Sequence, residues 1–149
     1  MTPTERPADP YLQAFEGGFS GVLRWHQLDD LWERLRAKPE GWFAYALGEA
    51  PPTKPLEPAD LDRFLSELDR LIRAEHGEDY CGIVYADSLQ NPDFVKVYDP
   101  NNLGAVCGSS GVRTLPGWTL SRLRPVDLHD ALPAPGNRRR WWQRLFGSA

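Results

Sequence analysis

The chain has 149 residues, of which 41% are hydrophobic and 26% charged, ordinary values for one globular domain. Six Trp, six Phe and five Tyr exclude a wholly disordered chain, and no apolar run approaches the ~18 residues of a membrane-spanning helix. The net charge of −4 is unevenly spread: the last twelve residues hold four Arg and no acid, which leaves 13 basic and 21 acidic residues in the rest and makes that body a poor nucleic-acid binder.

The first elements along the chain are one helix and one strand. Residues 1–10 are rich in proline and predict a flexible N-terminus. Within residues 11–25 the pattern predicts either a short strand or a packed loop at 19–25. A helix is predicted over 27–37, where apolar residues recur with the spacing of one buried face. Residues 41–47 are apolar on both faces of a strand, a pattern that favours a central position in a sheet.

The clearest element is a helix predicted over 58–76. It begins with Pro58, carries a stripe of leucines with Phe64, and precedes Gly77, which we expect to end it in a left-handed turn. Strands are predicted at 80–87 and 93–99, joined by a short hairpin loop, and then at 103–107 and 119–123.

This order, α-β-α-β-β-β, predicts an α+β fold. We expect an antiparallel sheet of about four strands with two helices packed on one face. The domain would span residues 11–132, followed by a proline-rich linker at 133–137 and a basic aromatic tail at 138–149.

A glycine-rich segment at 104–113 is the most suggestive part of the body. Its candidate ligand-binding residues are Cys107, Gly108, Ser109, Ser110 and Arg113. Converging backbone N–H groups and the Arg113 charge would suit an anion, and Cys107 could act as a thiolate nucleophile with His76 or His129 as base. The segment also fits a plain strand connection around a buried cysteine, and it lacks the spacing of a phosphate loop or dinucleotide fingerprint.

Nothing in the sequence predicts a metal or cofactor. The three histidines are isolated, and Cys81 and Cys107 lie too far apart for the usual ligand spacings. Two cysteines make no disulfide framework, and the first residues lack the apolar core of a signal sequence. We therefore expect free thiols and a cytoplasmic protein, without excluding a cross-strand pair.

The tail is the sharpest signal in the chain. On a helical wheel its apolar side chains cover one arc of about 140°, with Arg140, Gln143 and Arg144 opposite. The candidate partner-binding residues are Arg138, Arg139, Arg140, Trp141, Trp142, Arg144, Leu145 and Phe146. Residues 142–147 resemble the C-terminal membrane-targeting tails of bacterial peripheral proteins such as division-site ATPases. The resemblance implies a mode of attachment only, since the body lacks the phosphate loop of those enzymes.

Four uses of the tail stay open: packing on its own body, an anionic membrane surface at the inner face of the membrane, a protein groove, and nucleic acid. We expect a non-enzymatic binding or adaptor domain that contacts a protein or membrane partner partly through this tail. The alternatives are a small-ligand-binding domain or thiol enzyme that uses residues 104–113 and Cys107, and a subunit of a larger assembly.

Overall fold

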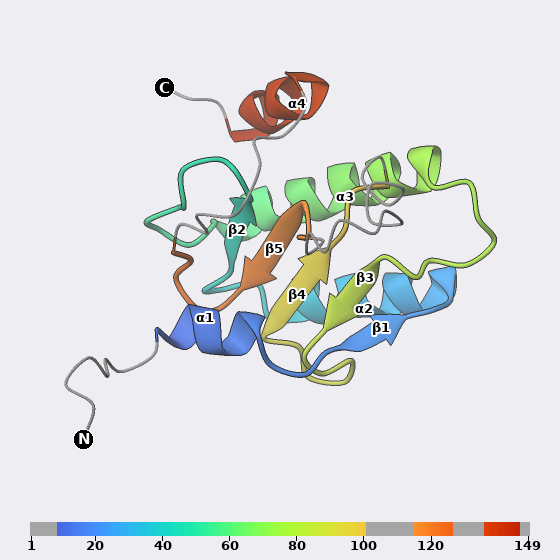
Figure 1. Cartoon of the computed structure of the whole chain (residues 1–149), viewed down its shortest axis with the longest axis horizontal. Coiled ribbons are helices and arrows are strands. Elements are labelled where there is room, and N and C mark those ends of the chain that lie inside the picture. The colour runs from blue at the N-terminus through green and yellow to red at the C-terminus, as the bar shows by residue number, and fades with distance from the viewer. Residues whose placement is uncertain (1–8, 101–114, 127–135, 147–149) are drawn as a thin grey trace, which may run out of the picture.

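The computed structural model describes residues 9–100, 115–126 and 136–146, and it confirms the α+β class (Figure 1). In chain order the elements are α1 Pro10–Phe15, β1 Ser20–Val22, α2 Trp25–Ala37, β2 Phe43–Ala46, α3 Pro58–Glu75, β3 Val84–Ala86, β4 Phe94–Val97, β5 Trp118–Ser121 and α4 Gly136–Phe146. No helix among these residues is both long and apolar enough to cross a membrane.

The five described strands form one antiparallel sheet in the order β1-β3-β4-β5-β2. Among the described strands β2 lies at an edge of the sheet, in contrast to the central position predicted for residues 41–47. Its apolar pattern has another cause, since each face of β2 is covered. Ala44 and Ala46 face the main core, while Tyr45 and Leu47 belong to a second cluster beneath α1.

The main core lies between one face of the sheet and the pair α2 and α3, as predicted. Leu28, Leu31, Trp32 and Leu35 of α2 are all at most 2% exposed, and the predicted stripe of α3 is buried along its whole length, with Leu71 its most exposed member at 8%. They pack on alternate strand residues, which include Val95 and Val97 of β4 and Leu120 of β5. The helical and strand periodicities therefore point at the same interior.

The opposite face of the sheet is partly covered by α1, a helix the sequence analysis did not assign. Asp9 caps it by accepting hydrogen bonds from Tyr11 N (2.8 Å) and Leu12 N (3.4 Å), and Pro10 occupies its first position. The Tyr11 ring is fully buried 5.1 Å from the Phe94 ring, and its hydroxyl lies 2.7 Å from Thr119 Oγ1. These contacts fix α1 across β4 and β5.

The end of α3 differs from expectation. The helix ends at His76 in extended backbone, and Gly77 is absent from the left-handed glycines among the described residues, which are Gly41, Gly48 and Gly82. His76 instead forms a 2.7 Å hydrogen bond between Nε2 and the Cys81 carbonyl. The His76 backbone N–H donates the last helical bond, to the Ile72 carbonyl, and the His76 side chain ties the end of α3 to the returning chain.

Candidate functional site

The basic tail forms the helix α4, which lies over α3 (Figure 1). Gly136 and Asn137, placed in the linker by the sequence analysis, are its first two residues. Trp141 and Leu145 are 7% and 8% exposed, and Trp142 and Phe146 are partly buried against the main core. The apolar arc read from the sequence is thus one face of a real helix.

This face rests on Phe64 of α3 and Trp118 of β5. The Phe64 ring lies 6.2 Å from Trp141 and 5.6 Å from Phe146, and Trp118 meets Trp141 edge-on at 5.6 Å. The Arg63 guanidinium donates a hydrogen bond to the Leu145 carbonyl at the end of α4. We expected this apolar arc to be available to a partner, but it is packed on its own chain. Packing on the body was one of the four uses of the tail that the sequence left open.

The outward side of α4 is polar and basic. Arg140, Gln143 and Arg144 are exposed, and we call this set the arginine face. Arg138 and Arg139 lie in the same helix, but their side chains are outside the described part of the structure. Residues 136–149 contain no acid, so α4 places positive charge on an otherwise acidic chain.

The other predicted site lies outside the described residues. This holds for the strand at 103–107, for Cys107, Gly108, Ser109, Ser110 and Arg113, and for the proposed base His129. The other cysteine, Cys81, is a fully buried free thiol, and its burial raises its pKa. The thiol-enzyme and anion-loop readings therefore remain predictions.

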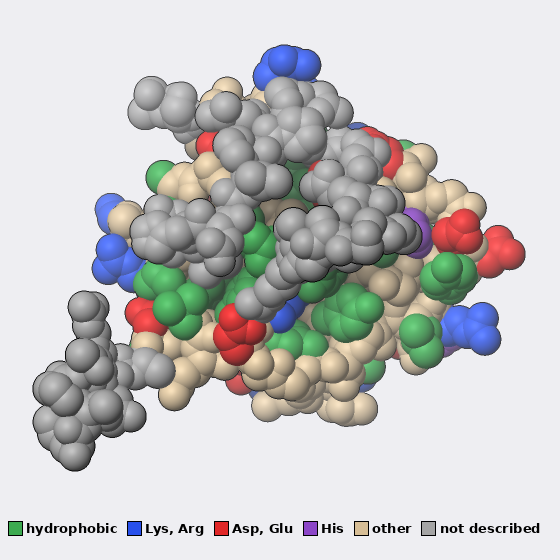
Figure 2. All heavy atoms as spheres, in the orientation of Figure 1, with side chains coloured by type: hydrophobic (Ala, Val, Ile, Leu, Met, Phe, Trp, Pro, Cys, Tyr) green, Lys and Arg blue, Asp and Glu red, His purple; other side chains and the backbone are tan. Residues whose placement is uncertain are grey.

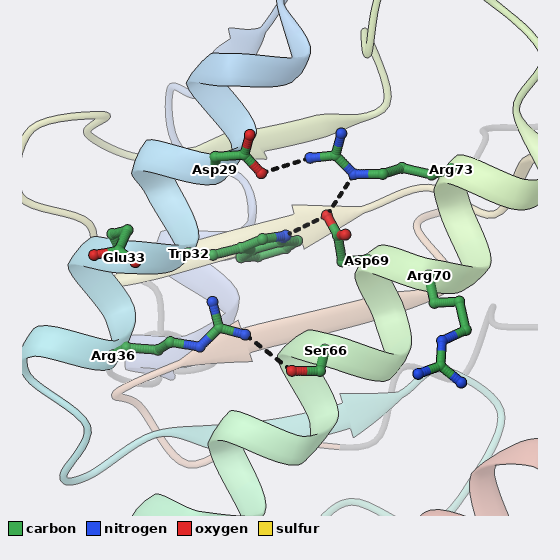
Figure 3. Close-up of a pocket in the computed structure, with 8 residues that line it drawn as sticks. All are labelled: Asp29, Trp32, Glu33, Arg36, Ser66, Asp69, Arg70 and Arg73. Atoms are coloured by element: carbon green, nitrogen blue, oxygen red, sulfur yellow. Dashed lines mark hydrogen bonds and ion pairs between the residues drawn. The ribbon is translucent and has the colours of Figure 1, made fainter.

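A groove of about 660 Å³ runs between α2 and α3 (Figure 3). Asp69 Oδ1, at its centre, accepts hydrogen bonds from Arg73 Nε (2.8 Å) and Trp32 Nε1 (3.0 Å). Arg73 Nη2 reaches across to Asp29 at 2.7 Å. A second link joins Arg36 of α2 to Asp62 at 2.7 Å and to Ser66 Oγ at 3.1 Å, both on α3.

These ion pairs brace the two helices. The carboxylates of Asp29, Asp62 and Asp69 are each engaged by an arginine. Figure 3 shows the Arg70 side chain directed away from this network. Within the described ranges no three His, Cys, Asp or Glu side chains are grouped to hold a metal ion.

Comparisons with protein-family models, with curated proteins and with solved structures found no match for this chain. Its function must therefore be argued from its own surfaces. The described structure offers two such surfaces: a helix with a basic outward face, and a group of half-buried rings beside the exposed side chains of Leu23 and Tyr80.

Proposed function

We propose that this chain is a non-enzymatic binding or adaptor domain that contacts an acidic protein surface through the arginine face of α4. The observation that carries the proposal is the polarity of that helix, whose aromatic side is packed on Phe64 and Trp118 while Arg140 and Arg144 are exposed. We also propose a cytoplasmic location, which suits the free thiol of Cys81.

The chemistry of such a contact is electrostatic. Each guanidinium presents several N–H donors in a planar fork that matches a carboxylate, and Arg140 and Arg144 are one helical turn apart on the same face. Exposed ion pairs contribute roughly 0–1 kcal/mol each, so binding through this face would be weak, fast and dependent on salt. Those properties suit a reversible contact.

Docking of α4 favours a protein partner over a membrane. A helix lying in a bilayer interface inserts its apolar face into the lipid, which here would require Trp141 and Leu145 to leave Phe64 and Trp118. That movement would uncover Phe64 and Trp118, and leaving a buried side chain such as Phe in water costs roughly 1.5–3 kcal/mol. An acidic protein surface can be met by Arg140 and Arg144 without that cost.

The test replaces both exposed arginines with glutamate in the full chain, Arg140→Glu with Arg144→Glu. The probes are a fluorescent Glu-rich peptide and vesicles containing phosphatidylserine. We expect the original chain to bind the peptide at low salt, the double variant to bind at least about tenfold more weakly, and vesicles to recover little protein. Raising ionic strength from ~0.01 M to ~0.15 M shortens the Debye length from about 30 to about 8 Å and should weaken binding.

The matched control is Arg34→Glu with Lys38→Glu, an equal charge change at exposed positions on and just after α2. This variant should retain most of the peptide binding. Equal losses in both double variants would attribute the binding to net charge and overturn the proposed face. Strong vesicle binding that requires Trp142 would overturn the protein-partner proposal in favour of a membrane.

A further inference from the structure

A cluster of rings lies at the end of α3, away from α4, in which Tyr80 is exposed while Trp25 and His76 are half-buried. The loop between β1 and α2 meets the loop between α3 and β3 there, and we name the cluster of Leu23, Trp25, His76 and Tyr80 the aromatic corner. Cys81 N donates to the Leu23 carbonyl at 2.8 Å, and Trp25 Nε1 donates to the Glu78 carbonyl at 3.3 Å. These bonds tie the two loops together, so the rings have fixed places.

The rings form a continuous series. The Arg73 guanidinium carbon lies 4.9 Å from the Trp25 ring centroid, Trp25 lies 6.1 Å from His76, and His76 lies 6.1 Å from Tyr80 at an interplanar angle of 89°. Gly82, with φ +71°, lets the Tyr80 ring pass beside the backbone, since a Cβ there would lie 3.1 Å from that ring. Backbone geometry thus positions an exposed tyrosine.

The aromatic corner exposes more apolar surface to solvent than is usual for large hydrophobic side chains. Leu23 is 62% exposed and Tyr80 50%, and among the described residues only Leu12 joins them as an exposed large hydrophobic side chain. Figure 2 shows hydrophobic, acidic, histidine and basic side chains together at the edge of the molecule where α3 ends. Grouped exposed aromatic and aliphatic side chains are typical of protein interaction sites.

The surrounding charge selects the kind of partner. Segments 23–30 and 73–80 carry two arginines against five carboxylates. Arg73 is already paired with Asp29 and Asp69. Glu78 and Asp79, which directly precede Tyr80, are exposed. Excess negative charge beside exposed rings favours a cationic side chain, which rings and carboxylates both attract.

We infer that the aromatic corner binds a basic segment of a partner protein, with an arginine or lysine on the Tyr80 ring and an adjacent apolar residue on Leu23. This inference does not depend on the arginine face of α4. Phe64, beneath α4, and His76, at the corner, are twelve residues apart on α3, which corresponds to about 18 Å along the helix. The two surfaces have opposite charge, so one chain could hold two different partners at once.

The test uses two labelled peptides with the full chain, one alternating Arg with Leu and one alternating Glu with Leu, measured by fluorescence anisotropy. We expect the Arg peptide to bind and the Glu peptide to bind far more weakly. Tyr80→Ala and Leu23→Ala should each weaken Arg-peptide binding about tenfold or more, and Tyr80→Phe should retain it. Glu78→Gln with Asp79→Asn should weaken it several-fold and reduce its salt dependence.

Matched controls exist elsewhere on the chain. Leu12→Ala removes the other exposed leucine, and Glu40→Gln with Glu57→Gln removes two exposed acids away from the corner. Both should leave binding unchanged. Equal binding of the two peptides, or equal losses in the control and corner variants, would overturn the inference. Should Tyr80→Ala fail to fold by circular dichroism, Leu23→Ala and the double acid variant decide the same question.

Discussion

Replacing Trp141 with alanine tests whether α4 is an integral part of the folded domain. Trp141 is 7% exposed, and its ring lies 5.6 Å from Trp118 and 6.2 Å from Phe64. Loss of a buried tryptophan ring usually costs about 3–5 kcal/mol of unfolding free energy. Because α4 is terminal to the other elements and can separate locally, we expect the lower end of that range, about 3 kcal/mol.

The assay is urea unfolding followed by far-ultraviolet circular dichroism, with a thermal melt as a second measure. A loss of about 3 kcal/mol corresponds to a fall in Tm of about 6–12 °C for a chain of this size. Arg140→Ala is the matched control on the same helix, and as an exposed position it should stay within about 0.5 kcal/mol of the original chain. Trp142→Ala, at a partly buried position, should fall between the two.

One result would refute this reasoning. If Trp141→Ala and Arg140→Ala both unfold at the same urea concentration as the original chain, α4 does not contribute to the fold. The aromatic arc would then be available to partners, and nothing would favour the arginine face over it as the contact surface.

Three further predictions concern the interior and the helix brace. Asp69→Ala should cost about 1–2 kcal/mol in urea unfolding because it leaves two buried or half-buried donors without their acceptor. Asp29→Ala, at a side chain 63% exposed, should cost less than about 0.5 kcal/mol, and a reversed order would contradict the geometry of the groove. Tyr11→Phe should cost about 1 kcal/mol by removing the bond to Thr119. Burial raises the pKa of the Tyr11 phenol above its usual value of about 10, so unfolding free energy should fall as pH rises above about 10, and Tyr11→Phe should flatten that fall. Burial also raises the pKa of Cys81, so site-resolved mass spectrometry should find its native labelling by iodoacetamide far slower than that of free cysteine, with the protection lost in urea.

The elements with strong periodicity were predictable from the sequence. The apolar stripe of α3 and the apolar positions of α2 each indicate one buried helix face, and this inference needs no information from other segments of the chain. The short helix α1 went unassigned, although Asp9 followed by Pro10 is a helix-start signal, because six residues are too few to show a period. The strand β1, only three residues long, was no more than one of two readings.

Contacts between distant segments account for the errors. The pattern of β2 correctly indicated two covered faces, but two covered faces do not require a strand on each edge, and among the described strands β2 pairs with β5 alone. The helix ends next to Gly77 as predicted, but Gly77 is not left-handed, and the His76 side chain bonds the Cys81 carbonyl five residues further along the chain. The aromatic corner was not seen at all, because Trp25 and Glu78 are 53 residues apart in sequence and no local pattern joins them.

The sequence by itself determined the class of fold, the two main helices and the amphipathic character of the tail, because each follows from periodicity and composition within one segment. It could not decide which face of the tail meets solvent. That depends on Phe64 and Trp118, which only the folded chain brings together with Trp141. Burial of apolar area lowers the free energy of the folded state whatever the distance in sequence between the two surfaces. The apolar arc of the tail was predicted to bind a partner, but tertiary packing places it against the core. The exposed arginines of α4 face outward as a result.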